Sequence, residues 1–256
     1  MIAVIGSAGT IGRHVAASLE EWGADVVRRD FRLGGDEYVD ARDSASLSRT
    51  LDGVAVVVNC ADYRLNLYVM RGAAAAGHPF PAPYSVQTLR DELQMRPIIV
   101  VDGELTEVQP LSGAAEREFP EPVGRAKGIY ALHSELATLP TAYPSLREAS
   151  FRLCLAPGLL EKLLALGEGD LPEPYVQSPE SVAVHQVEMR LNGSVVVGTA
   201  LTRGESAKST SEPAARAAVE LAEGRPSAPG TSPPEQAIED PEGFLGLLDT
   251  EVRWTS

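Results

Sequence analysis

The sequence is poor in cysteine, and basic residues are scarce relative to acidic ones. Only Cys60 and Cys154 occur among 256 residues. Each lies in an apolar run, which favours buried free thiols and a reducing, cytoplasmic location over an extracellular disulfide framework. The chain carries 22 Lys and Arg against 36 Asp and Glu, a formal charge of −14. Such a surface repels phosphate backbones, so we expect no nucleic-acid partner.

Long apolar runs and metal-ligand clusters are also missing. No segment approaches the roughly 18 to 20 consecutive apolar residues of a membrane span, and the first apolar run lacks the basic flank of a leader peptide. We therefore expect no membrane partner. No His, Cys and Asp side chains occur at metal-ligand spacing, so we expect no metal. With 44% hydrophobic residues, the chain is long enough for one large core or two modest ones.

Short apolar runs alternate with amphipathic stretches over the first 61 residues. Strands are predicted at 1–5, 24–30, 37–43 and 54–61, and helices at 10–22 and 44–53, with Gly23 as the stop of the first helix and Asp43 as the cap of the second. Strands that alternate with helices pair in parallel and need helices on both faces. The pattern predicts an α/β, Rossmann-like N-terminal domain.

A glycine-rich turn, GSAGTIG, joins the first strand to the first helix. Gly6 is expected to allow a tight turn, Gly9 to let the backbone approach a pyrophosphate, and Gly12 to let the helix pack on the strand. The unpaired amides and partial positive charge of a helix N-terminus suit a diphosphate. The candidate cofactor-binding turn therefore comprises Gly6, Ser7, Ala8, Gly9, Thr10, Ile11 and Gly12. The alternative is a compact turn that holds no ligand.

The end of the second strand, RRDFR, bears on the type of dinucleotide. An acid there accepts a hydrogen bond from the ribose 2′-hydroxyl of NAD, whereas arginines neutralise the 2′-phosphate of NADP. The sequence offers both, as Arg28, Arg29, Asp30 and Arg32, with Arg28, Arg29 and Asp30 as the candidate cofactor contacts, and solvated charges are the alternative interpretation. Two adjacent arginines in an acidic chain favour NADP over NAD. Asp40, at the expected end of the third strand, is a candidate contact for the adenine amino group.

Asn59, Cys60 and Ala61 follow a β-branched run, at the edge where open α/β sheets bind ligands. The stretch VVVNCADYRLNLYVMRGAAAAGH is similar to the saccharopine dehydrogenase family in its Asn-Cys strand end, its Asn-Leu helix and its Ala-Gly-His close. Downstream, FPEPVG and ALHSE with a later Leu-Pro resemble the substrate domain of that family. The resemblance covers most of the chain. It implies an NAD(P)-dependent oxidoreductase of the saccharopine or lysine dehydrogenase type.

The resemblance is interrupted after Gly77. In the family, the Ala-Gly-His close leads into a fifth strand and a long segment that forms part of the nicotinamide and substrate pocket. Here GHPF passes almost directly into PAPYSVQTLRDEL. The comparison implies an internal deletion, which indicates either a shortened relative with an incomplete site or a sequence from which residues are missing.

The pattern changes after residue 80. Asp102-Gly103 and Asn192-Gly193 are hairpin turns between apolar runs, and they predict a second, α+β domain on an antiparallel sheet, as the resemblance also implies. We expect a dinucleotide-binding domain at 1–80, a substrate and dimerisation domain at 81–225 that includes a helix at 209–223, and a linker with a C-terminal segment returning to the first domain at 226–256.

One histidine of the four in the chain is surrounded by polar groups in an otherwise apolar stretch. His133 precedes Ser134 and Glu135, and an imidazole titrates near neutral pH. We expect His133 to be the acid–base residue, and a satisfied structural histidine is the alternative. Ser134, Tyr130 and Arg125 are candidate substrate contacts, and Glu135 is a candidate partner for a substrate ammonium.

Several functions remain open on these residues. The first is an NAD(P)-dependent oxidoreductase, a homodimer, that acts at a carbon–nitrogen bond of a small amino acid or amine substrate. The second is a catalytically silent relative that serves as a binding or assembly module. A third is an NADP-dependent reductase with another small substrate. Turnover separates the first and third from the second, because all three allow dinucleotide binding.

Overall fold

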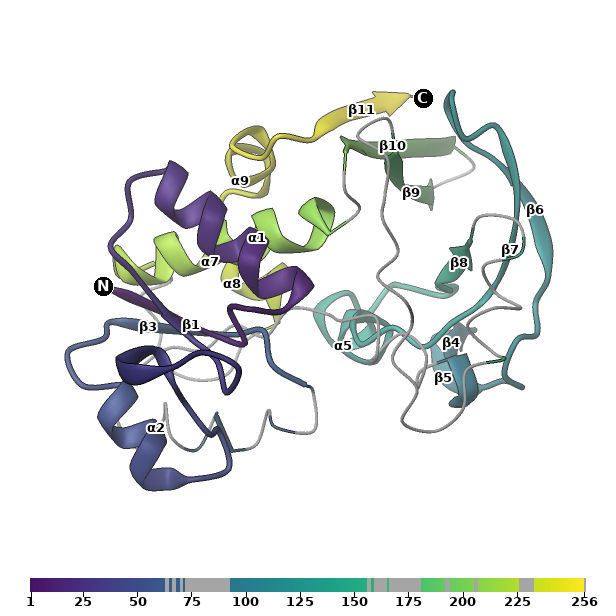
Figure 1. Ribbon diagram of the computed structural model, residues 1–256. Coiled ribbons are helices and arrows are strands. Elements are labelled where there is room, and N and C mark those ends of the chain that lie inside the picture. Colours follow the sequence, from purple (N-terminus) through teal and green to yellow (C-terminus); the bar gives the residue numbers. More distant parts are fainter. Residues whose placement is uncertain are drawn as a thin grey trace. The chain divides into compact units, whose positions relative to one another are not determined.

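The structure, a computed structural model, describes residues 1–62, 65, 68–69, 71, 93–155, 158, 165, 181–191, 194–204, 207–225 and 233–255 (Figure 1). The expected deletion after Gly77 and the turn at 192–193 lie outside these residues. The chain forms two compact units. Unit 1 comprises Met1–Ser85, Ser178–Gly230 and Glu239–Ser256, and unit 2 comprises Val86–Gln177 and Thr231–Ile238.

Unit 1 is built on a parallel three-stranded sheet. Strands β1 (Ile2–Ile5), β2 (Val26–Arg29) and β3 (Val56–Asn59) pair in the order β2-β1-β3. Helix α1 (Thr10–Glu21) connects β1 to β2, and α2 (Ser44–Thr50) lies between β2 and β3. This is the predicted α/β arrangement. Gly23 ends α1 with φ of +78°, and Asp43 caps α2 by accepting the Ala45 amide at 3.0 Å, both as expected.

The core fills both faces of this sheet, because successive side chains of each strand point to opposite sides. On one face, Ile2, Val4, Val56 and Val58 pack with α1 and with α7 (Lys208–Ala222). On the other face, Ala3, Ile5 and Val57 pack with Leu47 and Leu51 at α2. Figure 1 shows α1 and α7 side by side on one side of the strands and α2 on the other. The strands are therefore buried on both faces.

Helix α7 differs in placement from the sequence expectation. Residues 209–223 were expected within the second domain, but α7 packs on α1 and β3 in unit 1. Ala215 and Ala218 are fully buried in that contact. Small side chains allow two helices to approach closely, and nothing in the local pattern shows which helix an alanine stripe will meet.

The expected strand at 37–43 does not form. Residues Gly35–Glu37 make a 3₁₀ turn, η1, and Tyr38 makes one isolated bridge to Asp30. The prediction of a strand there was wrong. Val39 and Ala41 are nevertheless buried in the core beneath the sheet, so the alternation that suggested a strand reflects burial of a loop.

Unit 1 also contains an antiparallel sheet. Strands β9 (Val182–Leu191), β10 (Ser194–Arg203) and β11 (Glu251–Thr255) pair in the order β11-β10-β9. Strands β9 and β10 flank residues 192–193 in hairpin register. Helix α9 (Pro241–Gly246) precedes β11, and both belong to unit 1.

Unit 2 is an α+β assembly. Strands β4 (Ile98–Val101) and β5 (Glu104–Glu107) form the expected hairpin, with Asp102 and Gly103 both at positive φ. Strands β6 (Ala115–Glu118), β7 (Arg125–Tyr130) and β8 (Arg152–Cys154) form a second antiparallel sheet. Helix α5 (Glu135–Ala142) lies between β7 and β8 in the chain, and the short helix α8 (Pro234–Ala237) belongs to the same unit. The fold class is thus the one expected, although the sequence did not predict β6 and β7.

Both cysteines are free. Within the part of the chain that the structure describes, no helix combines the length and the apolarity needed to cross a bilayer.

Candidate functional site

The glycine turn lies at the carboxyl edge of the parallel sheet, between β1 and α1. Gly6 has φ of +82°, as its expected role in a tight turn requires. A Cβ at Gly6 would lie 2.6 Å from the Ala61 amide nitrogen, and a Cβ at Gly12 would lie 2.2 Å from the Gly6 carbonyl oxygen. Only hydrogen atoms fit at these two positions. Gly6 and Gly12 therefore hold the turn against β3 and the helix against the turn.

The turn leaves a small group of amides without acceptors. The Gly6 and Ser7 amides donate to the Arg29 carbonyl, and the Gly9 amide donates to the Gly6 carbonyl. Helix geometry gives the amides of Thr10, Ile11 and Gly12 no intrahelical acceptor, and the N-cap residue, Gly9, supplies no side-chain cap. These three donors stand at the positive end of the α1 dipole, which is an arrangement suited to an anion.

A buried hydroxyl adds to this group. Ser7 is 2% exposed, and its Oγ has no hydrogen-bond partner among the described residues. An unpaired buried hydroxyl costs free energy of folding, so such groups are found where a ligand or water completes them. Of the predicted turn residues, Ser7 and the three amides are thus the polar groups that a ligand would find unused.

The end of β3 closes the other side of the turn. Asn59 is 1% exposed and accepts the Ala61 amide through Oδ1 at 3.1 Å. The Cys60 amide donates to the Ile5 carbonyl at 2.7 Å. The structure therefore brings Asn59, Cys60 and Ala61 against the glycine turn, as the sequence predicts. Burial raises the pKa of the Cys60 thiol, so this cysteine is protonated at neutral pH and not a nucleophile.

The charged residues after β2 are arranged differently from the expectation. Arg28 donates from Nε and Nη2 to the two carboxylate oxygens of Glu20, at 3.0 and 2.9 Å. Arg29 donates to the Arg28 carbonyl at 3.0 Å. Asp30, 1% exposed, accepts the Ala8 amide at 3.1 Å and binds the guanidinium of Arg32. The structure thus pairs the last arginine of the RRDFR stretch with its aspartate.

Asp40 does not end a strand, because the expected third strand is absent. Its amide donates to the Ser46 hydroxyl at 3.2 Å, and its carboxylate accepts the Arg42 amide at 2.9 Å. Asp40 thus organises the entry to α2. Its expected contact with an adenine stays a prediction.

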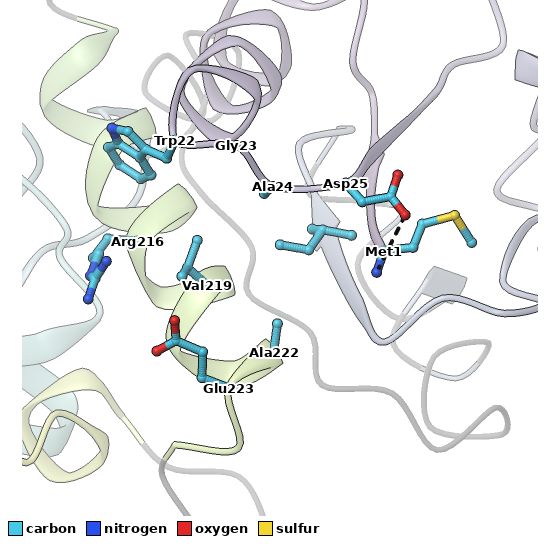
Figure 2. Close-up of a pocket in the computed structure, with 10 residues that line it drawn as sticks. Met1, Trp22, Gly23, Ala24, Asp25, Arg216, Val219, Ala222 and Glu223 are labelled. Atoms are coloured by element: carbon cyan, nitrogen blue, oxygen red, sulfur yellow. Dashed lines mark ion pairs between the residues drawn. The ribbon is translucent and has the colours of Figure 1, made fainter.

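A cavity of about 410 Å³ lies at the opposite edge of the sheet (Figure 2). It is bounded by the start of β1, the end of α1 and one side of α7, and Trp22, Arg216, Val219 and Glu223 are among its lining residues. Figure 2 shows these side chains and the ion pair between the Met1 amino group and Asp25. The glycine turn follows the carboxyl end of β1, whereas this cavity adjoins its amino end. The cavity is therefore separate from the candidate dinucleotide site.

The predicted substrate residues lie in unit 2, around the turn between β7 and α5. The Nδ1 atom of His133 is ion-paired with Glu135, and the His133 ring lies 4.2 Å from that of Phe151. Ser134 is the N-cap residue of α5 without a side-chain cap bond. A carboxylate at Nδ1 holds an imidazole in one orientation and leaves Nε2 as its other polar atom. His133, Ser134 and Glu135 are therefore together.

Tyr130 and Arg125 stand at opposite ends of β7. At a rise of about 3.3 Å per residue their Cα atoms are roughly 16 Å apart, and an odd separation puts their side chains on opposite faces. The structure does not bring these two together. Tyr130 instead pairs with Arg152, which donates to its hydroxyl at 2.9 Å and lies 4.3 Å from its ring centroid. Arg152 was missed because it meets Tyr130 only through the β7–β8 register.

Among the described residues, no group of three or more His, Cys, Asp or Glu side chains is placed to hold a metal ion.

Comparison with known proteins gives a structural likeness only. No protein-family model and no curated protein sequence matches this chain. The fold is similar to that of saccharopine dehydrogenase (L-Glu forming) from Saccharomyces cerevisiae, with a TM-score of 0.57 and 11% sequence identity, covering 100% of this chain and 99% of that chain. The chain thus has a fold similar to that of a saccharopine dehydrogenase, the family that the sequence motifs resemble. An identity of 11% supports a likeness in fold alone.

Two other solved structures match over shorter stretches. One is a short-chain dehydrogenase/reductase superfamily protein from Agrobacterium tumefaciens with bound NAD, with a TM-score of 0.33, 28% identity and coverage of 43% of this chain and 40% of that one. The other is a putative exported protein from Burkholderia pseudomallei, with a TM-score of 0.32, 21% identity and coverage of 47% and 57%.

Proposed function

We propose that the chain is an NAD(P)-dependent oxidoreductase of the saccharopine dehydrogenase type, acting at a carbon–nitrogen bond of a small amino acid or amine. One observation carries the proposal. The amides of Thr10, Ile11 and Gly12 stand in the uncapped first turn of α1, and the glycine turn that precedes them holds the buried, unpartnered hydroxyl of Ser7, at the carboxyl edge of a parallel sheet. Ligands of open α/β sheets bind at this edge. The saccharopine dehydrogenase-like fold is consistent with it.

The residues of the turn fit the diphosphate of a nicotinamide dinucleotide. We assign the three free amides to its oxygens, and the Ser7 hydroxyl to the same group as a donor. The cofactor, when bound, supplies hydride transfer. The turn's own residues bind and orient the cofactor: we propose that Gly9, which lacks a side chain, lets an anion approach, while Gly6 and Gly12 keep the amides in place. Of the two nicotinamide cofactors we propose NADP, because the half-exposed guanidinium of Arg32 stands beside Gly9 of the turn.

On the substrate side, we propose His133 as the acid–base residue and Glu135 as the carboxylate that orients it. Glu135 contacts Nδ1 of His133, and we propose the other ring nitrogen, Nε2, as the position at which a proton is taken up or released. Glu135 was expected to hold a substrate ammonium, and its contact with His133 favours the orienting role. The proposed substrate contacts still include Tyr130, Ser134 and Arg125. Arg152 donates to the Tyr130 hydroxyl, and we propose its guanidinium as a further contact, for a substrate carboxylate.

Dinucleotide binding is tested by thermal shift. A ligand that binds only the folded protein at 100 times its Kd adds about 2.7 kcal/mol of stability, or roughly 5 to 10 °C for a chain of this size. We expect such a shift with NADPH and none with adenosine, which has no phosphate. No shift with either NADPH or NADH overturns the proposed function.

Turnover is tested with the same protein and a panel of amino acids, amines and keto acids, followed by the nicotinamide absorbance. We expect His133→Gln to lower kcat by about 10²- to 10⁴-fold without altering the NADPH thermal shift, and the matched change His185→Gln on β9 to leave both unchanged. A thermal shift with NADPH, but no turnover with any combination of substrate and nicotinamide cofactor, identifies the catalytically silent binding module instead.

We also propose a cytoplasmic homodimer that binds neither nucleic acid nor membranes. Val187, Met189 and Trp254 are each about half exposed on β9 and β11, and the register places them on one face of the β11-β10-β9 sheet. An exposed apolar face of this kind is typical of association surfaces. Sedimentation equilibrium at two concentrations tests it, and a mass of 27.2 kDa at both contradicts the dimer.

A further inference from the structure

We propose that the Asp30–Arg32 pair selects a dinucleotide that carries a 2′-phosphate on its adenosine ribose: Arg32 is the specificity-determining residue and Asp30 positions it. The inference rests on the proposed dinucleotide site. It differs from the sequence expectation, in which Arg28 and Arg29 were the phosphate contacts and Asp30 was the acceptor for an unphosphorylated ribose.

Asp30 has no acceptor capacity left for a ribose hydroxyl. Its Oδ1 accepts the backbone amide and the Nε of Arg32, both at 2.9 Å. Its Oδ2 accepts the Ala8 amide at 3.1 Å and the Nη2 of Arg32 at 2.9 Å. An ionised carboxylate offers about four lone-pair positions, and four donors occupy them. Asp30 therefore accepts hydrogen bonds only from the protein and has no position left for the ribose 2′-hydroxyl of NAD.

The ionised state of Asp30 is secured by the same contacts. Burial opposes ionisation, but the hydrogen bonds from Arg32 and from the Ala8 amide outweigh it and hold the pKa of Asp30 below its usual range. A buried ionised carboxylate that is bidentate with a guanidinium fixes the plane of that guanidinium. Asp30 thus ties Arg32 to the glycine turn, through Ala8, in one orientation.

Arg32 presents the rest of its guanidinium beside the turn. Its Nη2 lies 3.4 Å from the position of a Cβ built on Gly9, so the group stands at the residue that precedes the free amides of α1. The Arg32 side chain is 49% exposed, against 1% for Asp30. A guanidinium has five N–H donors, and Asp30 takes two of them from the side chain. The other three are available to an anion that approaches from solvent. Such an anion contacts the exposed guanidinium of Arg32, because the Asp30 carboxylate is buried.

The neighbouring arginines contact other groups. Arg28 binds Glu20 on α1 through Nε and Nη2, and Arg29 donates from Nη1 to the Arg28 carbonyl, while its Nε is buried without a hydrogen-bond partner among the described residues. Arg32 differs from both in its place beside Gly9. A 2′-phosphate is the part of NADP that NAD lacks and carries about two negative charges at neutral pH. In a chain with a formal charge of −14, a local cation is needed to accept it, and Arg32 is the one that the turn presents.

The test compares NADPH with NADH, and 2′,5′-ADP with ADP, by isothermal titration on the full chain. We expect the parent protein to bind the 2′-phosphorylated member of each pair at least about tenfold more tightly, the effect of one or two charge-assisted hydrogen bonds. Arg32→Ala removes that preference and leaves NADH and ADP binding unchanged. Arg49→Ala, which removes the same charge from the exposed side of α2, keeps the preference.

Asp30→Asn separates positioning from simple charge. Removal of a negative charge close to a phosphate would by Coulomb's law strengthen NADPH binding. Loss of the anchor for Arg32 weakens it instead, and we expect a loss of roughly tenfold for NADPH with NADH binding retained as the check that the turn is intact. Tighter NADPH binding by Asp30→Asn overturns the positioning role.

The remaining outcomes also decide. Equal affinity of the parent for NADPH and NADH overturns this inference alone and leaves the dinucleotide site standing. Preserved selectivity in Arg32→Ala assigns the 2′-phosphate to another residue and overturns it as well. No binding of any of the four probes overturns the proposed function, and this inference with it.

Discussion

A methyl group at Gly12 is the sharpest available test of how the glycine turn is built. The Cβ of an alanine there would lie 2.2 Å from the Gly6 carbonyl oxygen, 2.8 Å from the Gly6 carbonyl carbon and 2.9 Å from the Ser7 Cα. All three neighbours are backbone atoms, so no change of rotamer relieves the contact. Gly12→Ala gains about 1 kcal/mol in helix propensity, whereas overpacking that moves backbone costs roughly 1 to 3 kcal/mol.

Because the clash involves three backbone atoms, we take the upper part of that range and expect a net loss of about 1 to 2 kcal/mol in the free energy of unfolding. For a chain of this size the melting temperature falls by roughly 2 to 8 °C. The measurement is urea unfolding followed by circular dichroism, with the midpoint and slope fitted separately. A parent-like midpoint for Gly12→Ala refutes the close contact between helix and turn.

Gly9→Ala is the matched control, with the opposite balance of effects. Its Cβ would lie 3.2 Å from the Gly6 carbonyl oxygen and 3.4 Å from the terminal nitrogen of Arg32, a flexible side chain. The φ of −78° and ψ of 169° at Gly9 suit alanine. We expect a loss of stability below about 1 kcal/mol, together with at least about tenfold weaker NADPH binding, because the methyl group occupies the approach to the free amides. Parent-like binding by Gly9→Ala would place the ligand elsewhere.

Three further predictions concern stability and reactivity. Glu212 is 5% exposed, and burial, together with the nearby carboxylate of Asp249, raises its pKa. A raised folded-state pKa means that stability is lost as pH rises through it, so Glu212→Gln should raise the melting temperature at pH 7 and leave it unchanged below the unfolded-state pKa of about 4.3. A change in melting temperature that is largest in acid contradicts this sign. Burial raises the pKa of Cys60 and is also the first cause at Cys154, so a thiol reagent at neutral pH should react slowly with the native protein and rapidly in denaturant, whereas fast native labelling would show an exposed thiolate. Asp43→Ala removes the cap of α2 and should cost about 1 kcal/mol in urea unfolding, with the exposed change Asp52→Ala as its control; equal effects of the two would show that the cap contributes nothing.

Local patterns predicted the first unit well where one strand or helix determines its own boundaries. The apolar runs at β1 and β3, the stripe of α1 and its glycine stop, and the aspartate cap of α2 all depend on neighbours within a few residues. The same holds for the Asp102-Gly103 hairpin, whose turn residues specify positive φ. The pattern failed at 37–43, because alternating burial in a loop over the core has the same period as a strand.

The sequence by itself determined the glycine turn, since Gly6 and Gly12 have no substitute where a Cβ would meet backbone. It also determined the polar group at His133, whose members are adjacent in the chain. Only the tertiary structure decided that Arg28 binds Glu20, that Arg152 binds Tyr130, and that Asp30 binds Arg32 and the Ala8 amide. A charged side chain can reach any partner that the fold brings within hydrogen-bond distance, so composition names the charges while packing chooses which of them remain available to a ligand.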